Sequence, residues 1–152
     1  MTTAAVVLLS LHLAATAAMT GLIWFVQVVH YPLFAAVGNA EFAAYSRSHQ
    51  ALTTLVVGPA MLVEAATAAL LILARPAGVP QWMAWAGVAL VAVIWASTAL
   101  LQVPAHGRLS AGFDAETGAF LVTTNWIRTI AWSLRALLAG AMLLVALRPV
   151  NG

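Results

Sequence analysis

The sequence predicts an all-α fold: an integral membrane bundle of four transmembrane helices that run antiparallel, up-down-up-down. Three observations predict it. Of the 152 residues, 64% are hydrophobic, only 7% are charged, and four long apolar runs follow one another. Soluble domains carry charge on roughly a quarter of their residues, and a membrane-spanning helix needs about 20 predominantly apolar residues. We therefore expect residues 1–152 to form a single transmembrane four-helix domain.

The expected spans cover about residues 4–30, 51–74, 81–101 and 121–147. The second helix is expected to begin earlier, near residue 40, because the more polar stretch EFAAYSRSHQ can lie in the interfacial region. The first run has no basic residue before it and stays apolar past its small residues, so we interpret it as a retained helix rather than a cleaved signal.

Three prolines divide the apolar pattern. Pro32 follows the first span and Pro104 follows the third, as is typical of residues that end a helix. Pro59 lies inside the second span, where it predicts a kink.

Composition excludes several classes of function. The chain contains no Cys, which excludes disulfides, thiolate metal ligands and a thiol nucleophile. Its six basic residues are all Arg and form no patch, so nucleic-acid binding is not predicted. The expected partners are the lipid bilayer and a lipophilic small molecule. A homo-oligomer or a membrane complex is the expected assembly.

Orientation rests on four Arg residues at the membrane boundaries. Arg75 and Arg148 lie on the side of the termini, and Arg47 and Arg108 lie on the opposite side. Because cytoplasmic loops carry the excess of Lys and Arg, this even count leaves both orientations open. The termini side carries no acidic residue, and we place the termini in the cytoplasm, with the protein in a bacterial inner membrane.

Polar residues of all four spans are expected to meet at one membrane edge. Successive residues of a helix point about 100° apart, and alternating helix directions bring the end of the first and third spans beside the start of the second and fourth. The expected polar layer consists of Gln27, His30, His49, Gln102, His106, Asn125 and Arg128. His106 joins it if the backbone stays helical past Pro104.

This layer predicts acid–base chemistry. His30, His49 or His106 is expected to act as general base, because imidazole titrates near neutral pH. Arg128 and Asn125 are then expected to stabilise a developing oxyanion. The expected substrate-binding residues are Gln27, Gln102, Trp24, Tyr31 and Trp126, the last three lining an aromatic slot.

The cofactor is left open between none and a His-ligated metal ion. Neutral imidazole suits zinc, copper or iron, and the ligands would be His30, His49 and His106. No His-x-x-x-His pair fixes two ligands on one helix, so each would come from a different element. His12 lies about 27 Å from His30 by helix rise, and it has no evident partner at its depth.

Deeper in the bundle, Glu64 and Arg135 predict a structural ion pair. They face the interior of the second and fourth helices. Helix rise places Glu64 about 22 Å from His49 and Arg135 about 15 Å from Asn125, a gap that a long Arg side chain can bridge. A role as a proton relay or in binding substrate charge is the alternative.

The segment TNWIRTIAWSLRALL, with Asn125 and Arg128 just inside the fourth helix, resembles the closing motif of the anthrone-oxygenase-like family of small four-helix membrane proteins. Chain size, four spans and an aromatic-rich first helix ending near His30 extend the resemblance in outline. It implies an oxygenase that oxidises polycyclic aromatic substrates without an obvious cofactor. The residue match covers Asn125 and Arg128 only, and VPAHGRLSAGFD has no counterpart in the family pattern.

The sequence thus favours a membrane-embedded oxygenase or oxidoreductase that acts on a lipophilic or aromatic substrate. The alternative is a non-catalytic membrane subunit or a lipid- or quinone-binding protein, since four helices of this length leave little surface outside the membrane. The chain offers too few discontinuous helices and no clear filter for a transporter or channel.

Overall fold

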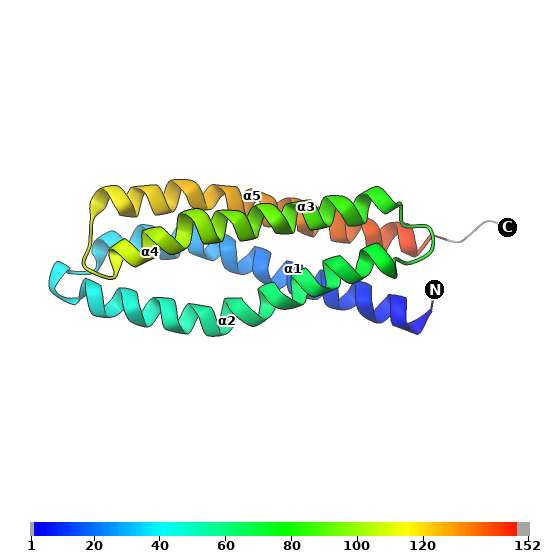
Figure 1. Ribbon diagram of the computed structural model, residues 1–152, viewed down its shortest axis with the longest axis horizontal. Coiled ribbons are helices and arrows are strands. Elements are labelled where there is room, and N and C mark those ends of the chain that lie inside the picture. Colours follow the sequence, from blue (N-terminus) through cyan, green and yellow to red (C-terminus); the bar gives the residue numbers. More distant parts are fainter. Residues whose placement is uncertain (1, 149–152) are drawn as a thin grey trace.

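The computed structural model describes residues 2–148, and every long element is helical (Figure 1). Within those residues there is no β-strand. In chain order the elements are α1 (Thr3–Phe25), the π turn η1 (Val26–His30), the 3₁₀ turn η2 (Pro32–Ala36), α2 (Asn39–Leu73), α3 (Gln81–Ser97), the π turn η3 (Thr98–Gln102), α4 (Val103–Leu109) and α5 (Ala115–Ala146).

These elements form four continuous segments that are long and apolar enough to cross a membrane: Thr3–Ala36, Asn39–Leu73, Gln81–Leu109 and Ala115–Ala146. Each contains one of the four predicted apolar runs. The second begins near residue 40, as expected. The fourth begins earlier than expected, because Asp114 caps its first turn.

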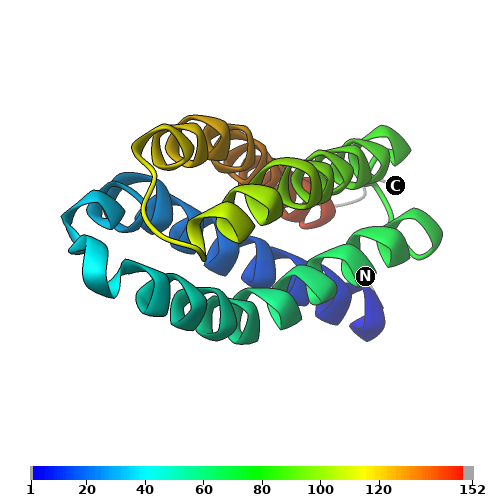
Figure 2. The same ribbon diagram turned by 60° about the vertical axis from the view of Figure 1, so that its left-hand side comes forward.

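Each segment packs against two others, in the ring α1–α2–α3–α5. The start of α1, the end of α5 and the connection between α2 and α3 lie at one end of the bundle, and the other two connections lie at the opposite end (Figures 1 and 2). The end with the connection between α2 and α3 is called the termini end. The opposite end, with the other two connections, is called the site end. Figure 1 also shows that α2, which contains Pro59, is bent rather than straight.

A π turn precedes each of the two prolines that were expected to follow a span. Tyr31 N–H donates to Val26 O, and Val103 N–H donates to Thr98 O, five residues back in both cases. Such a wide turn leaves room for the following proline ring, and Pro104 lies in the first turn of α4, where a missing N–H removes no hydrogen bond. The expectation that Pro32 and Pro104 follow the ends of their spans is therefore wrong. The helical backbone continues to Ala36 in the first segment and to Leu109 in the third, where it carries His106 onward.

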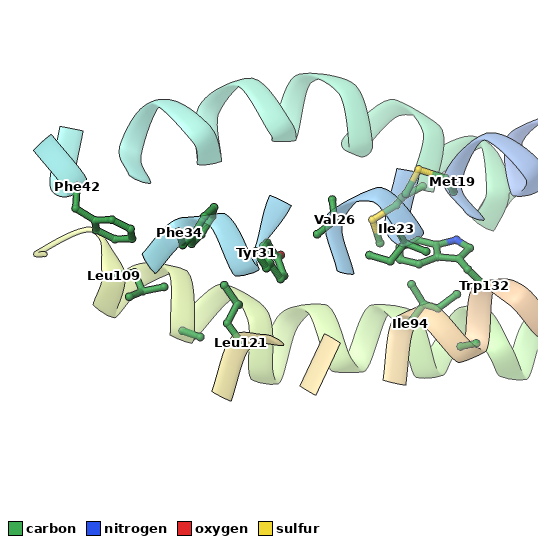
Figure 3. Close-up of a cluster of buried hydrophobic side chains, with 13 residues drawn as sticks. Met19, Ile23, Val26, Tyr31, Phe34, Phe42, Ile94, Leu109, Leu121 and Trp132 are labelled. Atoms are coloured by element: carbon green, nitrogen blue, oxygen red, sulfur yellow. The ribbon is translucent and has the colours of Figure 1, made fainter. Parts of the chain in front are cut away.

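The buried apolar side chains form two clusters. One occupies the middle and the site end, from Trp132 and Met19 to Phe34 and Phe42 (Figure 3). The other fills the termini end and includes Leu9, Leu71, Val79, Met83 and Met142. Between them along α1 and α5 lie buried polar residues, so the bundle has two apolar layers separated by a polar one.

Asp114 stabilises the start of α5, the helix that carries Asn125 and Arg128. Its Oδ2 accepts the Thr117 backbone N–H at 2.8 Å and also the Thr117 hydroxyl. The Thr117 hydroxyl, followed by that backbone N–H, holds the pKa of Asp114 below its ordinary value. A carboxyl group with a lowered pKa in the folded state contributes stability above its unfolded pKa, and the contribution is lost as the pH falls through the folded value.

Asp114→Ala is therefore expected to lower the unfolding temperature at neutral pH and to have a smaller effect in acid. Asp114→Asn should keep most of the stability, because Asn caps helices about as well as Asp. Thermal unfolding of the three proteins at both pH values checks this. An equal drop for Asp114→Ala at neutral and acid pH would contradict it.

Candidate functional site

The polar residues expected at one edge do meet at the site end, where most of them belong to one of two hydrogen-bonded groups. The longer group runs from η1 through α5 and back to α4. Asn125 Nδ2 donates to Gln27 Oε1 at 2.8 Å, and Arg128 donates to Asn125 Oδ1 from Nε at 2.9 Å and from Nη2 at 2.6 Å. Arg128 Nη2 also lies 3.1 Å from the Tyr31 hydroxyl, which lies 3.0 Å from His106 Nε2.

The donors and acceptors in this group predict a tautomer for His106. A guanidinium group only donates, so the Tyr31 oxygen accepts from Arg128. Within residues 2–148 the Tyr31 hydroxyl has no partner besides Arg128 and His106, and we assign its single hydrogen to the bond with His106 Nε2, because that hydrogen would otherwise stay unpaired. Neutral imidazole carries one hydrogen, which in His106 must then lie on Nδ1.

We expect nitrogen NMR of His106 to show a protonated Nδ1 and an unprotonated Nε2. Tyr31→Phe removes the hydroxyl donor and should shift the ring toward the opposite tautomer. The His106 signals are assigned as those lost in His106→Ala. A wild-type spectrum with the proton on Nε2 would mean that Tyr31 accepts from both neighbours, and the assigned direction would be wrong.

The second group is a pair of histidines. His30 Nε2 lies 2.9 Å from His49 Nδ1, and the Thr53 hydroxyl lies 3.1 Å from the same His49 nitrogen. The His49 ring centroid is 4.6 Å from that of His30 and 5.3 Å from that of His106. All three expected histidines therefore lie side by side, with His49 in the middle.

Gln102 reaches from the end of η3 to α5. Its Nε2 donates to the Thr124 hydroxyl oxygen at 3.0 Å, and that hydroxyl donates to the Phe120 carbonyl at 2.7 Å. Because the one hydroxyl hydrogen of Thr124 is already used, its oxygen can only accept from Gln102, which fixes the amide orientation. Gln102 Oε1 is left on the opposite side of the amide.

A cavity of about 490 Å³ lies next to these groups. Its polar lining includes Tyr31, His49, Gln102, His106 and Arg128, together with Gln50, Thr53, Thr54 and Thr98. The rest of the lining is mostly apolar and includes Met19, Leu22, Val26, Val57, Met61, Trp95 and Trp132. The volume lies within the range of small-molecule sites, roughly 300–1,000 Å³, which also combine an apolar lining with a few polar groups.

The cavity opens sideways, between α2 and α3. Lining residues on the facing edges of these segments are exposed at the bundle surface: Thr54 on α2 and Trp95, Ala99 and Val103 on the other side. A ligand can therefore enter from the flank of the bundle rather than along its axis.

Not every expected site residue touches the cavity. Gln27 and Asn125 lie behind Arg128, and His30 lies behind His49. These three orient the residues that line the wall. They are positioning residues in this geometry.

Trp24 and Trp126 were expected to line the aromatic slot, but they lie on the outer surface. They are 43% and 42% exposed and pack edge to face, with ring centroids 5.6 Å apart. Tyr31, the third residue expected in the slot, does line the cavity, and the other large aromatic surfaces come from Trp95 and Trp132. A sequence signal for both existed, because Trp95 shares a helix face with Gln102 and Trp132 shares one with Arg128.

The histidines do not form a ready three-ligand metal set. Within the described part of the chain, no three or more His, Cys, Asp or Glu side chains are grouped so as to hold a metal ion. His106 Nε2 is engaged by Tyr31, which separates it from the nitrogen pair of His30 and His49.

A separate set of polar residues lies deeper in the bundle, between the two apolar clusters. Arg135 Nη2 lies 3.3 Å from Glu64 Oε1 in an ion pair that is almost fully buried. Glu64 Oε2 accepts the Trp132 indole N–H at 2.7 Å, and Arg135 Nη1 donates to the Gly87 carbonyl at 2.7 Å. At the same level His12 does find a partner, because its Nδ1 lies 2.9 Å from the Thr67 hydroxyl.

Comparisons of the chain with protein-family models, with curated proteins and with solved structures found no match. The resemblance of the Asn125–Arg128 motif to the anthrone-oxygenase-like family therefore stays a prediction. The geometry of the site alone carries the functional argument.

Proposed function

We propose that the protein spans a bilayer as an up-down-up-down bundle, in a bacterial inner membrane with both termini in the cytoplasm. The length and hydropathy of all four long segments support the part of this proposal that concerns crossing a membrane. Large apolar side chains are also exposed on each segment, among them Leu11, Leu55, Leu100 and Leu137. Lipid tails would cover these side chains, whereas water would not.

The proposed function is an oxygenase or oxidoreductase that acts on a lipophilic aromatic substrate within the membrane. The observation that carries it is the cavity, which is mostly apolar, opens on the flank of the bundle and has two histidines and an arginine on one wall. In a bilayer such an opening faces lipid. A substrate dissolved in the membrane then reaches the polar wall without passing through water.

In the proposed mechanism His49 acts as general base. It lines the cavity, and its Nδ1 pairs with His30, which lies nearer the site end of the bundle. His49 removes a proton from the substrate, and the negative charge that develops on a substrate oxygen is stabilised by Arg128 and Tyr31 on the same wall. The substrate anion then bonds through carbon to dioxygen, the oxidant that the family resemblance implies. Dioxygen is reduced by two electrons to a peroxide, and His49 returns the proton to it, so the product is a substrate hydroperoxide.

Oxygen uptake by the purified protein in mild detergent tests this proposal, with a panel of electron-rich hydroxyaromatic compounds as substrates. A general base contributes about 10²–10⁴-fold to a rate, so His49→Ala should lower uptake by about that factor. The matched control is His12→Asn, because an amide can keep a bond to Thr67 in the deeper layer. Metal analysis and a visible spectrum of the same sample decide whether a cofactor takes part.

Two outcomes would refute the proposal. One is an absence of uptake with every compound in a folded wild-type sample. The other is a His49→Ala protein that is as active as wild type, which would remove the proposed base.

A further inference from the structure

Gln102 and His106 both line the cavity, and each carries one buried polar atom that has no hydrogen-bond partner within residues 2–148: Gln102 Oε1 and His106 Nδ1. The third such atom, Ser97 Oγ, belongs to a residue outside the cavity lining. Gln102 is only 1% exposed. Buried polar atoms are nearly always hydrogen-bonded in folded proteins, because an unpaired one retains its desolvation penalty. Two such atoms on one wall of one cavity point to a bound group that pairs with both.

These two atoms are neighbours with opposite roles. Gln102 and His106 are four residues apart on the helical run from η3 into α4, so their side chains share one face on successive turns. Because Gln102 Nε2 is engaged by Thr124, the free Gln102 atom is a carbonyl oxygen that only accepts. In the tautomer assigned above, Tyr31 donates to His106 Nε2, so the free His106 nitrogen carries a hydrogen and donates.

We propose that Gln102 Oε1 and His106 Nδ1 together bind a hydroxyl group attached to an aromatic ring, as in an alkylated phenol or quinol. A hydroxyl donates one bond and accepts others, so one oxygen satisfies both atoms. An ether or a ketone only accepts, and either would leave Gln102 Oε1 buried and unpaired. The proposal rests on the proposed function, since it takes this cavity as the substrate site.

The remaining lining indicates what the hydroxyl is attached to. Leu22, Val57 and Met61 offer apolar surface, and Trp132 offers an aromatic face. The exposed rim at Thr54 and Ala99 lets an alkyl chain extend toward the flank of the bundle. A ring that bears a hydroxyl at one end and an alkyl chain at the other matches both ends of the cavity.

The test compares para-heptylphenol with para-heptylanisole, which differ by the hydroxyl hydrogen and one methyl group. Binding to wild-type protein in detergent is measured by calorimetry, with empty micelles as the blank for partitioning. An unpaired buried acceptor weakens binding by about tenfold to a hundredfold, so the phenol should bind better by that factor. Gln102→Leu should abolish the preference. Gln81→Leu, the same change at the far end of α3, should keep it.

A measurement on the unmodified protein keeps the test valid if Gln102→Leu does not fold. Carbon NMR of the Gln102 side-chain carbonyl should shift when the phenol is added and stay unchanged with the anisole. If the two probes bind wild type equally, the hydroxyl proposal is overturned while the lipophilic site stands. If neither probe binds, the proposed use of the cavity is overturned as well.

Discussion

Arg135→Met is expected to destabilise the protein by about 3–5 kcal/mol, the range measured when one partner of a buried ion pair is removed. Arg135 and Glu64 are 1% and 3% exposed, so the carboxylate that remains has no access to water. In the structure the Glu64 carboxylate accepts hydrogen bonds from the side chains of Arg135 and Trp132. After the substitution only the bond from the Trp132 indole N–H would be left. Denaturant unfolding of the purified protein, followed by tryptophan fluorescence, measures the loss.

The double variant Glu64→Leu/Arg135→Met is the control for this prediction. Apolar replacement of both members of a buried pair is often neutral, but Glu64→Leu also leaves the buried Trp132 indole N–H without its acceptor. The double variant should therefore recover part of the stability that the single variant loses. The Gly87 carbonyl loses the hydrogen bond from Arg135 Nη1, but it lies inside α3 and so keeps a place in the hydrogen bonding of the helix backbone. A single variant as stable as wild type would show that the pair contributes little to the fold.

Helix periodicity and helix rise predicted the polar layer well, because both are fixed by backbone geometry. Direction and depth together placed His49 beside His30 and Arg128 beside Asn125, and the structure joins both pairs by hydrogen bonds. The same reasoning placed Glu64 and Arg135 within reach of each other, and they form the buried ion pair.

What periodicity could not supply is local geometry that depends on contacts between helices. The two π turns change the pitch just before Pro32 and Pro104, and each ends at a site residue, His30 or Gln102. A proline pattern alone indicates a helix end, and nothing in the sequence shows that a wider turn will let the helix continue.

The aromatic residues show the same limit. Trp24 lies one turn from Gln27, yet its indole N–H donates to Ser133 on the outer surface. Whether a large side chain fills a cavity or covers the outer surface between two packed helices, here called the seam, depends on which helices are neighbours. Here α1 packs against α5 along that seam, which draws Trp24 toward Trp126 and away from the cavity.

Arg128→Met is expected to reduce oxidation of a hydroxyaromatic substrate by about 10²–10³-fold, the loss seen when one donor to a developing oxyanion is removed. Arg128 is 7% exposed, lines the cavity and has no carboxylate partner within residues 2–148. Its positive charge is therefore free to interact with a substrate. The substitution also removes the donor to Tyr31 and leaves Asn125 Oδ1 unpaired, so thermal unfolding must be measured beside activity.

Two further variants separate charge from geometry. Arg128→Lys keeps the charge but cannot reproduce the paired bonds from Nε and Nη2 to Asn125, so it should recover only part of the rate. Asn125→Ala leaves the guanidinium present but unsupported, and it should lower the rate by less than Arg128→Met. If Arg128→Lys is fully active, charge alone is sufficient and the hydrogen-bonded chain from Gln27 serves only the fold. If Arg128→Met is fully active in a folded protein, Arg128 does not stabilise an oxyanion. Its role would then be limited to its hydrogen bonds with Asn125 and Tyr31.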